Sequence, residues 1–109
     1  MLPKLLNFLT VKGEKRWTYQ LLITFNNQVI RQLTITDHYQ EKHPEITNEL
    51  IWAIMKKLNG LRREATDYQG KRKVYKWEIT HQEKNYRFFF WFDDYNPHGL
   101  WIRNCFRID

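Results

Sequence analysis

The strongest constraint on the fold is a run of alternating side chains near the N-terminus. Apolar residues occupy every second position from Trp17 to Phe25, and the positions between them hold Thr18, Gln20, Leu22 and Thr24. A period of two places one set of side chains on one face of a strand. A second run, 29–35, follows the pair Asn26–Asn27, which tolerates the positive φ of a tight turn. Val29, Leu33 and Ile35 of this run share one parity with Arg31, whose charge must therefore reach a sheet edge or a partner. The pattern predicts a β-hairpin over about 16–36.

A helix is predicted downstream, over about 47–59. Apolar residues recur there at spacings that draw a single stripe along a helix: Ile46, Leu50, Ile51, Ile54 and Leu58. Thr47 suits the N-cap position, and Asn59–Gly60 suits the helix end. Glu49 in the first turn and Lys56–Lys57 in the last turn complement the helix dipole.

Three more strands are predicted from the alternation in 73–80, 86–94 and 100–109. The middle run is apolar on both parities except at Arg87, which is typical of a central strand covered on both faces. The chain is therefore predicted to be an α+β domain: an N-terminal β-hairpin, one main helix, then a three-strand antiparallel meander. The helix would pack on one face of a five-stranded sheet, and 1–109 would form a single domain.

Composition limits the function classes. The formal net charge is +6, which favours acidic partners, chiefly nucleic acid or an acidic protein, over a basic protein with no such partner. The aromatic share of 17% favours a surface groove or a partner interface, a homodimer included. The single cysteine, Cys105, lies in an apolar stretch, so we expect a buried thiol in a reducing cytoplasm. No apolar run reaches the ~20 residues of a membrane helix, and we expect no membrane partner.

Several kinds of site are not predicted. The sequence has no Gly-rich phosphate loop, no nucleophile elbow and no paired cysteines. His38 and His43 are five residues apart, whereas four would place them on one helical face, so no metal site is expected there. The adjacent carboxylates Asp93–Asp94 point to opposite faces of a strand. We therefore expect neither a metal nor a cofactor.

Cationic and proton-exchanging side chains remain as candidates: His38, Lys42, His43, His81, Arg87, His98, Arg103 and Arg107. Cleavage of RNA without metal needs such groups, because a base must take the 2′-hydroxyl proton while cations stabilise the phosphate. Trp101, Arg103 and Arg107 share one parity, which predicts a strand face that stacks a base and binds phosphates. Alternatively, Trp101 belongs to the core and the arginines pair with neighbouring carboxylates. Arg87 would lie either at an exposed strand start or in a functional cleft.

The segments "ITDHYQEKHPEITNELI", "YRFFFWFDD" and "IRNCFRID" resemble the RelE-like toxin nucleases, most closely the BrnT-like and phage-encoded small nucleases. This resemblance implies metal-independent cleavage of RNA and pairing with an acidic antitoxin-like protein. Lys42 and His43 match the Lys-His element of that family, Arg87 matches its strand arginine, and Arg103 or Arg107 matches a terminal-strand cation.

The leading hypothesis is thus a cytoplasmic, toxin-type endoribonuclease. Its predicted catalytic residues are His43, His38 and Arg87, and its predicted nucleic-acid-binding residues are Lys42, Trp101, Arg103 and Arg107. Two alternatives stay open: a non-catalytic basic and aromatic nucleic-acid-binding module, and a small interaction or inhibitor protein.

Overall fold

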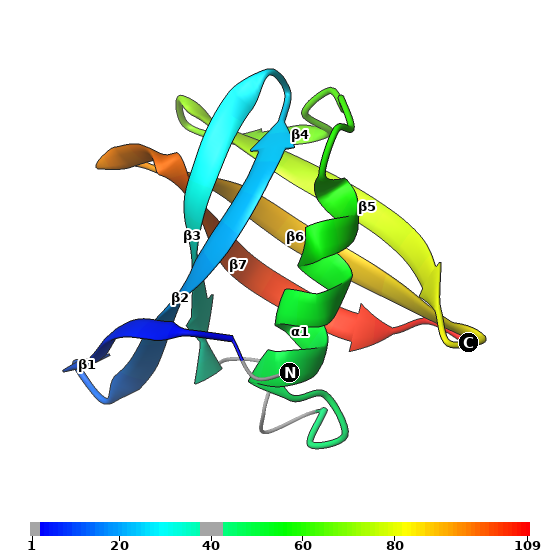
Figure 1. Cartoon of the computed structure of the whole chain (residues 1–109), viewed down its shortest axis with the longest axis horizontal. Helices are drawn as coiled ribbons and strands as arrows, with labels where there is room; N and C mark the ends of the chain where they lie inside the picture. The colour runs from blue at the N-terminus through cyan, green and yellow to red at the C-terminus, as the bar shows by residue number, and fades with distance from the viewer. Residues whose placement is uncertain (1–2, 38–42) are drawn as a thin grey trace.

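The computed structural model describes residues 3–37 and 43–109. Within these residues, seven strands form one sheet around a short helix (Figure 1). The strands are β1 (Leu5–Val11), β2 (Glu14–Phe25), β3 (Gln28–Thr36), β4 (Asp67–Gln69), β5 (Arg72–His81), β6 (Lys84–Asp93) and β7 (Asn96–Arg107). The helix α1 (Asn48–Met55) continues into one 3₁₀ turn, η2 (Lys56–Leu58).

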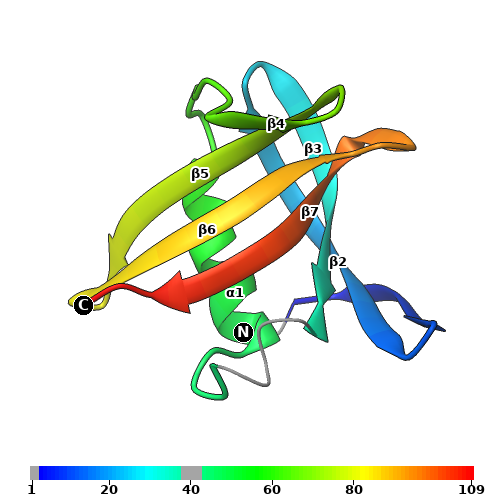
Figure 2. The ribbon, with the colours of Figure 1, turned by 180° about the vertical axis from the view of Figure 1, so that it is seen from behind.

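The strands follow the order β1-β2-β3-β7-β6-β5-β4 across the sheet. Neighbouring strands are antiparallel except β3 and β7, which are parallel. The helix lies across one face of the sheet, called the inner face here; Figure 2 shows the opposite, outer face, with the helix behind the strands. The connection through α1 and the later strands allows two parallel strands to lie side by side.

The sequence patterns correctly located the hairpin, the helix and the meander. Asn26 and Asn27 form the turn between β2 and β3 with φ of 52° and 61°. Thr47 caps α1, because its hydroxyl accepts the Leu50 N–H at 3.1 Å. The helix buries its apolar stripe against the sheet, including Ile51 and Ile54.

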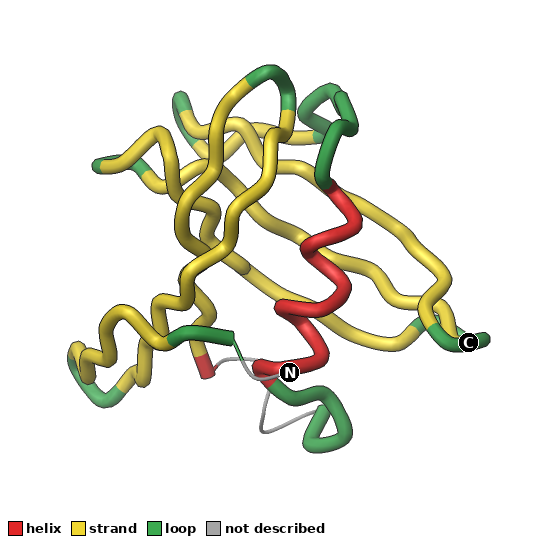
Figure 3. Tube along the Cα trace, in the orientation of Figure 1, coloured by secondary structure: helices red, strands yellow, loops and turns green. Residues whose placement is uncertain are grey.

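The predicted fold class is wrong. Of the described residues, 62% are in strands and 12% are helical, so the fold is mostly a sheet rather than an α+β domain. The sheet is mixed and has seven strands among the described residues instead of five (Figure 3). No strand was predicted where β1 lies, and β4 lies between the predicted helix and the predicted strand 73–80. The parallel β3–β7 pair joins the hairpin to the meander.

The core fills the inner face. Phe25, Tyr75 and Phe90 meet there with ring centroids 5.5–5.6 Å apart, and each is at most 5% exposed. Cys105 is fully buried in the same core, as predicted, and burial raises the pKa of its thiol. Neither α1 nor η2, the helices of the described part of the chain, is long and apolar enough to cross a membrane.

Two register shifts change which side chains face the core. One lies between Gln20 and Ile23 where β2 pairs with β3, and the other lies between Phe89 and Phe90 where β6 pairs with β7. Near the first shift Ile30 is buried and Val29 is 48% exposed, whereas Leu33 is buried. The prediction that Val29 and Leu33 share a face is therefore wrong.

Candidate nucleic-acid interface

The outer face of the sheet carries aromatic and arginine side chains in neighbouring positions. On β6 and β7, the pairs Phe88–Cys105 and Phe90–Ile102 are in the core. Because successive residues of a strand point to opposite faces, the residues that flank these core pairs point outward. Two outward pairs follow from the register: Trp91 with Trp101, and Arg87 with Phe106.

A groove of about 550 Å³ crosses this face at the Trp91–Trp101 pair. Its walls come from β2, β4, β5, β6, β7 and the β6–β7 turn. They include the rings of Trp91, Tyr95 and Trp101, and three arginines matched in number by three carboxylates: Arg16, Arg72 and Arg103 with Glu14, Asp93 and Asp94. Tyr95 is 97% exposed at the turn between β6 and β7. The groove thus combines rings and cations, which are the two components of a single-strand binding surface.

Arg72 covers one of the two indoles. Its Cζ atom lies 4.0 Å from the centre of the Trp91 ring, a cation–π contact. Asp94 holds the guanidinium in place, accepting from Arg72 Nε at 3.1 Å and from a terminal nitrogen. The hydrogen bond to Arg72 lowers the pKa of Asp94, and the same bond raises the pKa of Arg72.

Arg16 covers the second indole in the same way. Its Cζ atom lies 5.1 Å from the centre of the Trp101 ring, and its Nε donates to Glu14 Oε1 at 2.7 Å. Arg16 pairs with Thr36 of β3, whereas Trp101 pairs with Thr34, so the arginine reaches the indole diagonally across β3. Each indole of the groove is therefore paired with a guanidinium that a carboxylate positions.

Arg103 differs from these two arginines. It is exposed in the groove, and its side chain has no hydrogen bond or ion pair with another described residue. It is also the extra residue of β7 at the second register shift, because Phe89 pairs with Asn104 and Phe90 pairs with Ile102. Its guanidinium is available to a phosphate.

A second cluster surrounds the Phe106 ring on the same face. The His43 ring stacks on Phe106 with centroids 5.9 Å apart, and the Arg87 Cζ atom lies 5.7 Å from the Phe106 centre. Phe89 packs beside Phe106 at 6.2 Å. Two nitrogens of Arg87 contact Glu78 Oε2 at 2.7 and 2.5 Å, so most of the arginine's charge is already balanced.

The predicted site residues are only partly brought together. Trp101 and Arg103 line the groove, and His43 and Arg87 meet at Phe106. The predicted residues His38 and Lys42 lie outside the described residues.

Arg107 does not share the face of Trp101 and Arg103, so that prediction is wrong. The extra residue in β7 reverses the alternation, and Arg107 pairs with the core residue Tyr86. Its Nε donates to Asp109 at 2.6 Å, which raises the pKa of Arg107. The carboxylate that balances Arg107 is thus two residues along the same segment and not on a neighbouring strand, as the alternative had expected.

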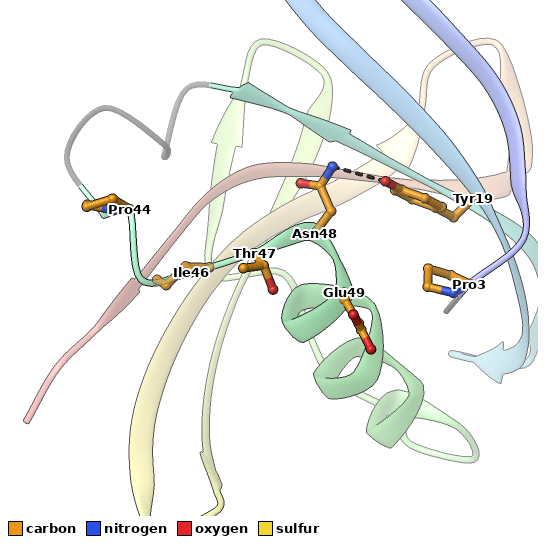
Figure 4. A pocket seen from close by; sticks show the side chains of 7 residues that line it. All are labelled: Pro3, Tyr19, Pro44, Ile46, Thr47, Asn48 and Glu49. Atoms are coloured by element: carbon orange, nitrogen blue, oxygen red, sulfur yellow. Dashed lines mark hydrogen bonds between the residues drawn. The ribbon is translucent and has the colours of Figure 1, made fainter. Parts of the chain in front are cut away.

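The N-terminus of α1, a few residues after His43, is lined differently from the groove. A pocket of about 640 Å³ opens there, and Figure 4 shows its lining side chains. The described lining includes the carboxylate of Glu49 and no cation. Asn48 donates to the Tyr19 hydroxyl at 3.1 Å, and the Thr47 hydroxyl is occupied by the helix cap. The described part of this pocket is thus poorly suited to phosphate.

Sequence reasoning missed Arg16, Arg72, Trp91 and Phe106. One local signal was present, since Arg87, Phe89 and Trp91 share one parity of β6. Arg16 and Arg72 gave no such signal, because they reach the groove from strands that are distant in sequence.

Among the described residues, no three His, Cys, Asp or Glu side chains are grouped to hold a metal ion. Comparison of the chain with protein families, with curated proteins and with solved structures found no match. The resemblance to RelE-like toxins stays a prediction.

Proposed function

We propose that this protein binds single-stranded nucleic acid, RNA in the first instance, on the outer face of its sheet. The observation that carries the proposal is the pair of adjacent indoles, Trp91 and Trp101, each covered by an arginine that a carboxylate positions. Unstacked bases bind proteins by stacking on aromatic rings and on guanidinium planes.

The accessible stacking surfaces are the two guanidinium groups and Trp101, because Trp91 is only 7% exposed beneath Arg72. The side chains of Arg16 and Arg72 are 32% and 30% exposed, so the guanidinium faces turned away from the indoles meet solvent. Trp101 is itself half-buried, as are Phe89 and Phe106 further along the face. A duplex keeps its bases stacked on one another, so these surfaces favour a single strand.

The charge of the face supports phosphate binding of moderate strength. Glu14, Glu78 and Asp94 balance three of its arginines, and Asp93 adds a further carboxylate to the groove, whereas Arg103 is unpaired among the described residues. Lys76, which pairs with Phe89 on the outer face, adds another exposed cation. Stacking would therefore supply most of the affinity, and a few phosphate contacts the rest.

Fluorescence anisotropy with a labelled ten-nucleotide uridine-rich RNA in EDTA tests this proposal. Replacing a stacking ring costs ~1–3 kcal/mol per base, so Trp101→Leu should weaken binding by roughly 5- to 150-fold. The matched control is Trp52→Leu, which removes an indole from α1 on the inner face. Equal affinity of wild type and Trp101→Leu, or a preference for duplex RNA, would exclude this interface.

A second candidate function is cleavage of the bound strand by His43. The observation in its favour is that His43 and Arg87 contact the same Phe106 ring, further along the outer face. In a metal-independent ribonuclease of toxin type, His43 would act as the general acid or base, and Arg87 would stabilise the charge on the phosphate. An acidic antitoxin-like protein would then cover this cationic face in a reducing cytoplasm.

Incubation of end-labelled RNA with excess protein in EDTA tests the cleavage function. The wild type should cut the RNA, while His43→Ala and Arg87→Ala should leave it intact without losing the affinity measured above. If the wild-type protein binds RNA and leaves it uncut, cleavage is excluded and the binding function stands.

A further inference from the structure

The edge strand β1 exposes an unusual amount of apolar surface. Four of its side chains are about half-exposed: Leu5 (50%), Leu6 (45%), Phe8 (46%) and Leu9 (50%). A register shift lies between Leu5 and Asn7, but the strand has no proline and no charged residue. Charges, prolines and β-bulges are the usual means by which an edge strand avoids pairing with another chain, and of these β1 has only the irregularity between Leu5 and Asn7.

We propose that β1 pairs with β1 of a second copy of this chain, in antiparallel orientation, to form a twofold dimer. Within the described residues β1 is the outermost strand at one end of the sheet (Figures 1 and 2). The backbone N–H of Phe8 donates to the side-chain oxygen of its neighbour Asn7 at 2.9 Å. A carbonyl of a second β1 strand can replace this local acceptor.

The residues of β1 favour one register. With Asn7 on the twofold axis, Leu5 faces Leu9 of the second copy, Leu6 faces Phe8, and the two Asn7 amides face each other. The same register places Lys4 opposite Thr10. A register centred on Phe8 instead would place Lys4 opposite Lys12, and like charges directly opposite each other are destabilising.

The area available matches a weak dimer. The four exposed side chains leave on the order of 350 Å² of apolar surface per copy. Strand pairing covers only the flanks of these side chains, so with the backbone of a seven-residue strand the pair would bury a total of at most ~1,000 Å², the lower limit for a specific interface. We therefore expect a dimer that dissociates on dilution through the micromolar range.

Such a dimer would determine how the outer faces of the two copies are oriented. The twofold axis of an antiparallel strand pair is perpendicular to the sheet, so both outer faces lie on the same side. If the proposed nucleic-acid binding is correct, one strand could contact both copies, and avidity would raise its affinity. The dimer itself does not depend on that function.

Sedimentation velocity of the protein alone, from 1 to 200 µM, tests the dimer. The wild type should convert from monomer to dimer over this range, and Leu6→Lys should remain a monomer. The control is Leu22→Lys, which places the same charge at a 68% exposed leucine of β2 and should dimerise normally. A wild type that stays monomeric at 200 µM overturns the proposal, as does equal loss in both variants.

Disulfide trapping tests the register. Residues directly opposite in an antiparallel pair have Cα atoms ~4.5–5.5 Å apart, a separation that a disulfide spans. Asn7→Cys should therefore give a covalent dimer on mild oxidation. Thr10→Cys should not, because its two copies would lie ~20 Å apart at ~3.3 Å per residue. The native Cys105 does not compete, since it is fully buried. Equal cross-linking of the two variants would contradict the strand pairing.

Discussion

Arg103 offers the sharpest test of the proposed interface. It lies exposed in the groove and has no side-chain partner among the described residues, so Arg103→Ala releases no carboxylate and leaves the fold unchanged. Each phosphate contact to a single strand adds about 0.7 to the slope of log K against log salt concentration. The variant should therefore lose about 0.7 from that slope. Between 50 and 200 mM salt, this difference amounts to roughly 2.5-fold in affinity.

The assay is anisotropy with the same labelled RNA at 50, 100 and 200 mM KCl. Lys57→Ala is the matched control, because Lys57 is an exposed cation on η2, close to His81 and away from the groove. Its removal lowers the net charge of the protein by the same amount. An unchanged slope in Arg103→Ala, or an equal fall in Lys57→Ala, would show that phosphate is not bound at Arg103.

Three further predictions concern the folded state. Phe90→Ala should lower the free energy of unfolding by about 3–5 kcal/mol in urea titrations, because the fully buried ring packs on two other rings. Burial, and then the charge of Lys57, lower the pKa of His81 below its ordinary value of about 6.5. The stability that neutral His81 contributes is therefore complete above pH ~6.5 and is lost as the pH falls toward the folded-state pKa. His81→Asn should flatten the pH dependence of the urea midpoint in that pH range. Cys105 should react with a thiol reagent only after denaturant is added, because burial raises its pKa and blocks access.

The elements predicted from the sequence are those that a local pattern determines. The β2–β3 hairpin needs only its alternation and the Asn26–Asn27 turn, and both are properties of adjacent residues. The helix likewise depends on one stripe and on the Thr47 cap. Such signals survive in any tertiary context that buries the apolar face.

The missed strands lack a local signal. β1 exposes both of its faces, so its apolar residues do not alternate with polar ones. β4 has three exposed residues and owes its extended form to pairing with β5. The parallel β3–β7 pair joins residues more than sixty positions apart, for example Leu33 with Leu100. Non-local pairings of this kind determined the fold class, and the sequence-based prediction of that class was wrong.

The groove shows why only part of the site could be predicted. Strict alternation along β7 placed Arg107 beside Arg103, but a single extra residue opposite β6 turns Arg107 toward the inner face. The same extra residue buries Cys105 and leaves Arg103 exposed. The cations that replace Arg107 on the outer face are Arg16 and Arg72, which strand order brings to the two indoles. The two indoles of the site therefore follow from the alternation of β6 and β7, whereas Arg16 and Arg72 reach them only in the assembled sheet.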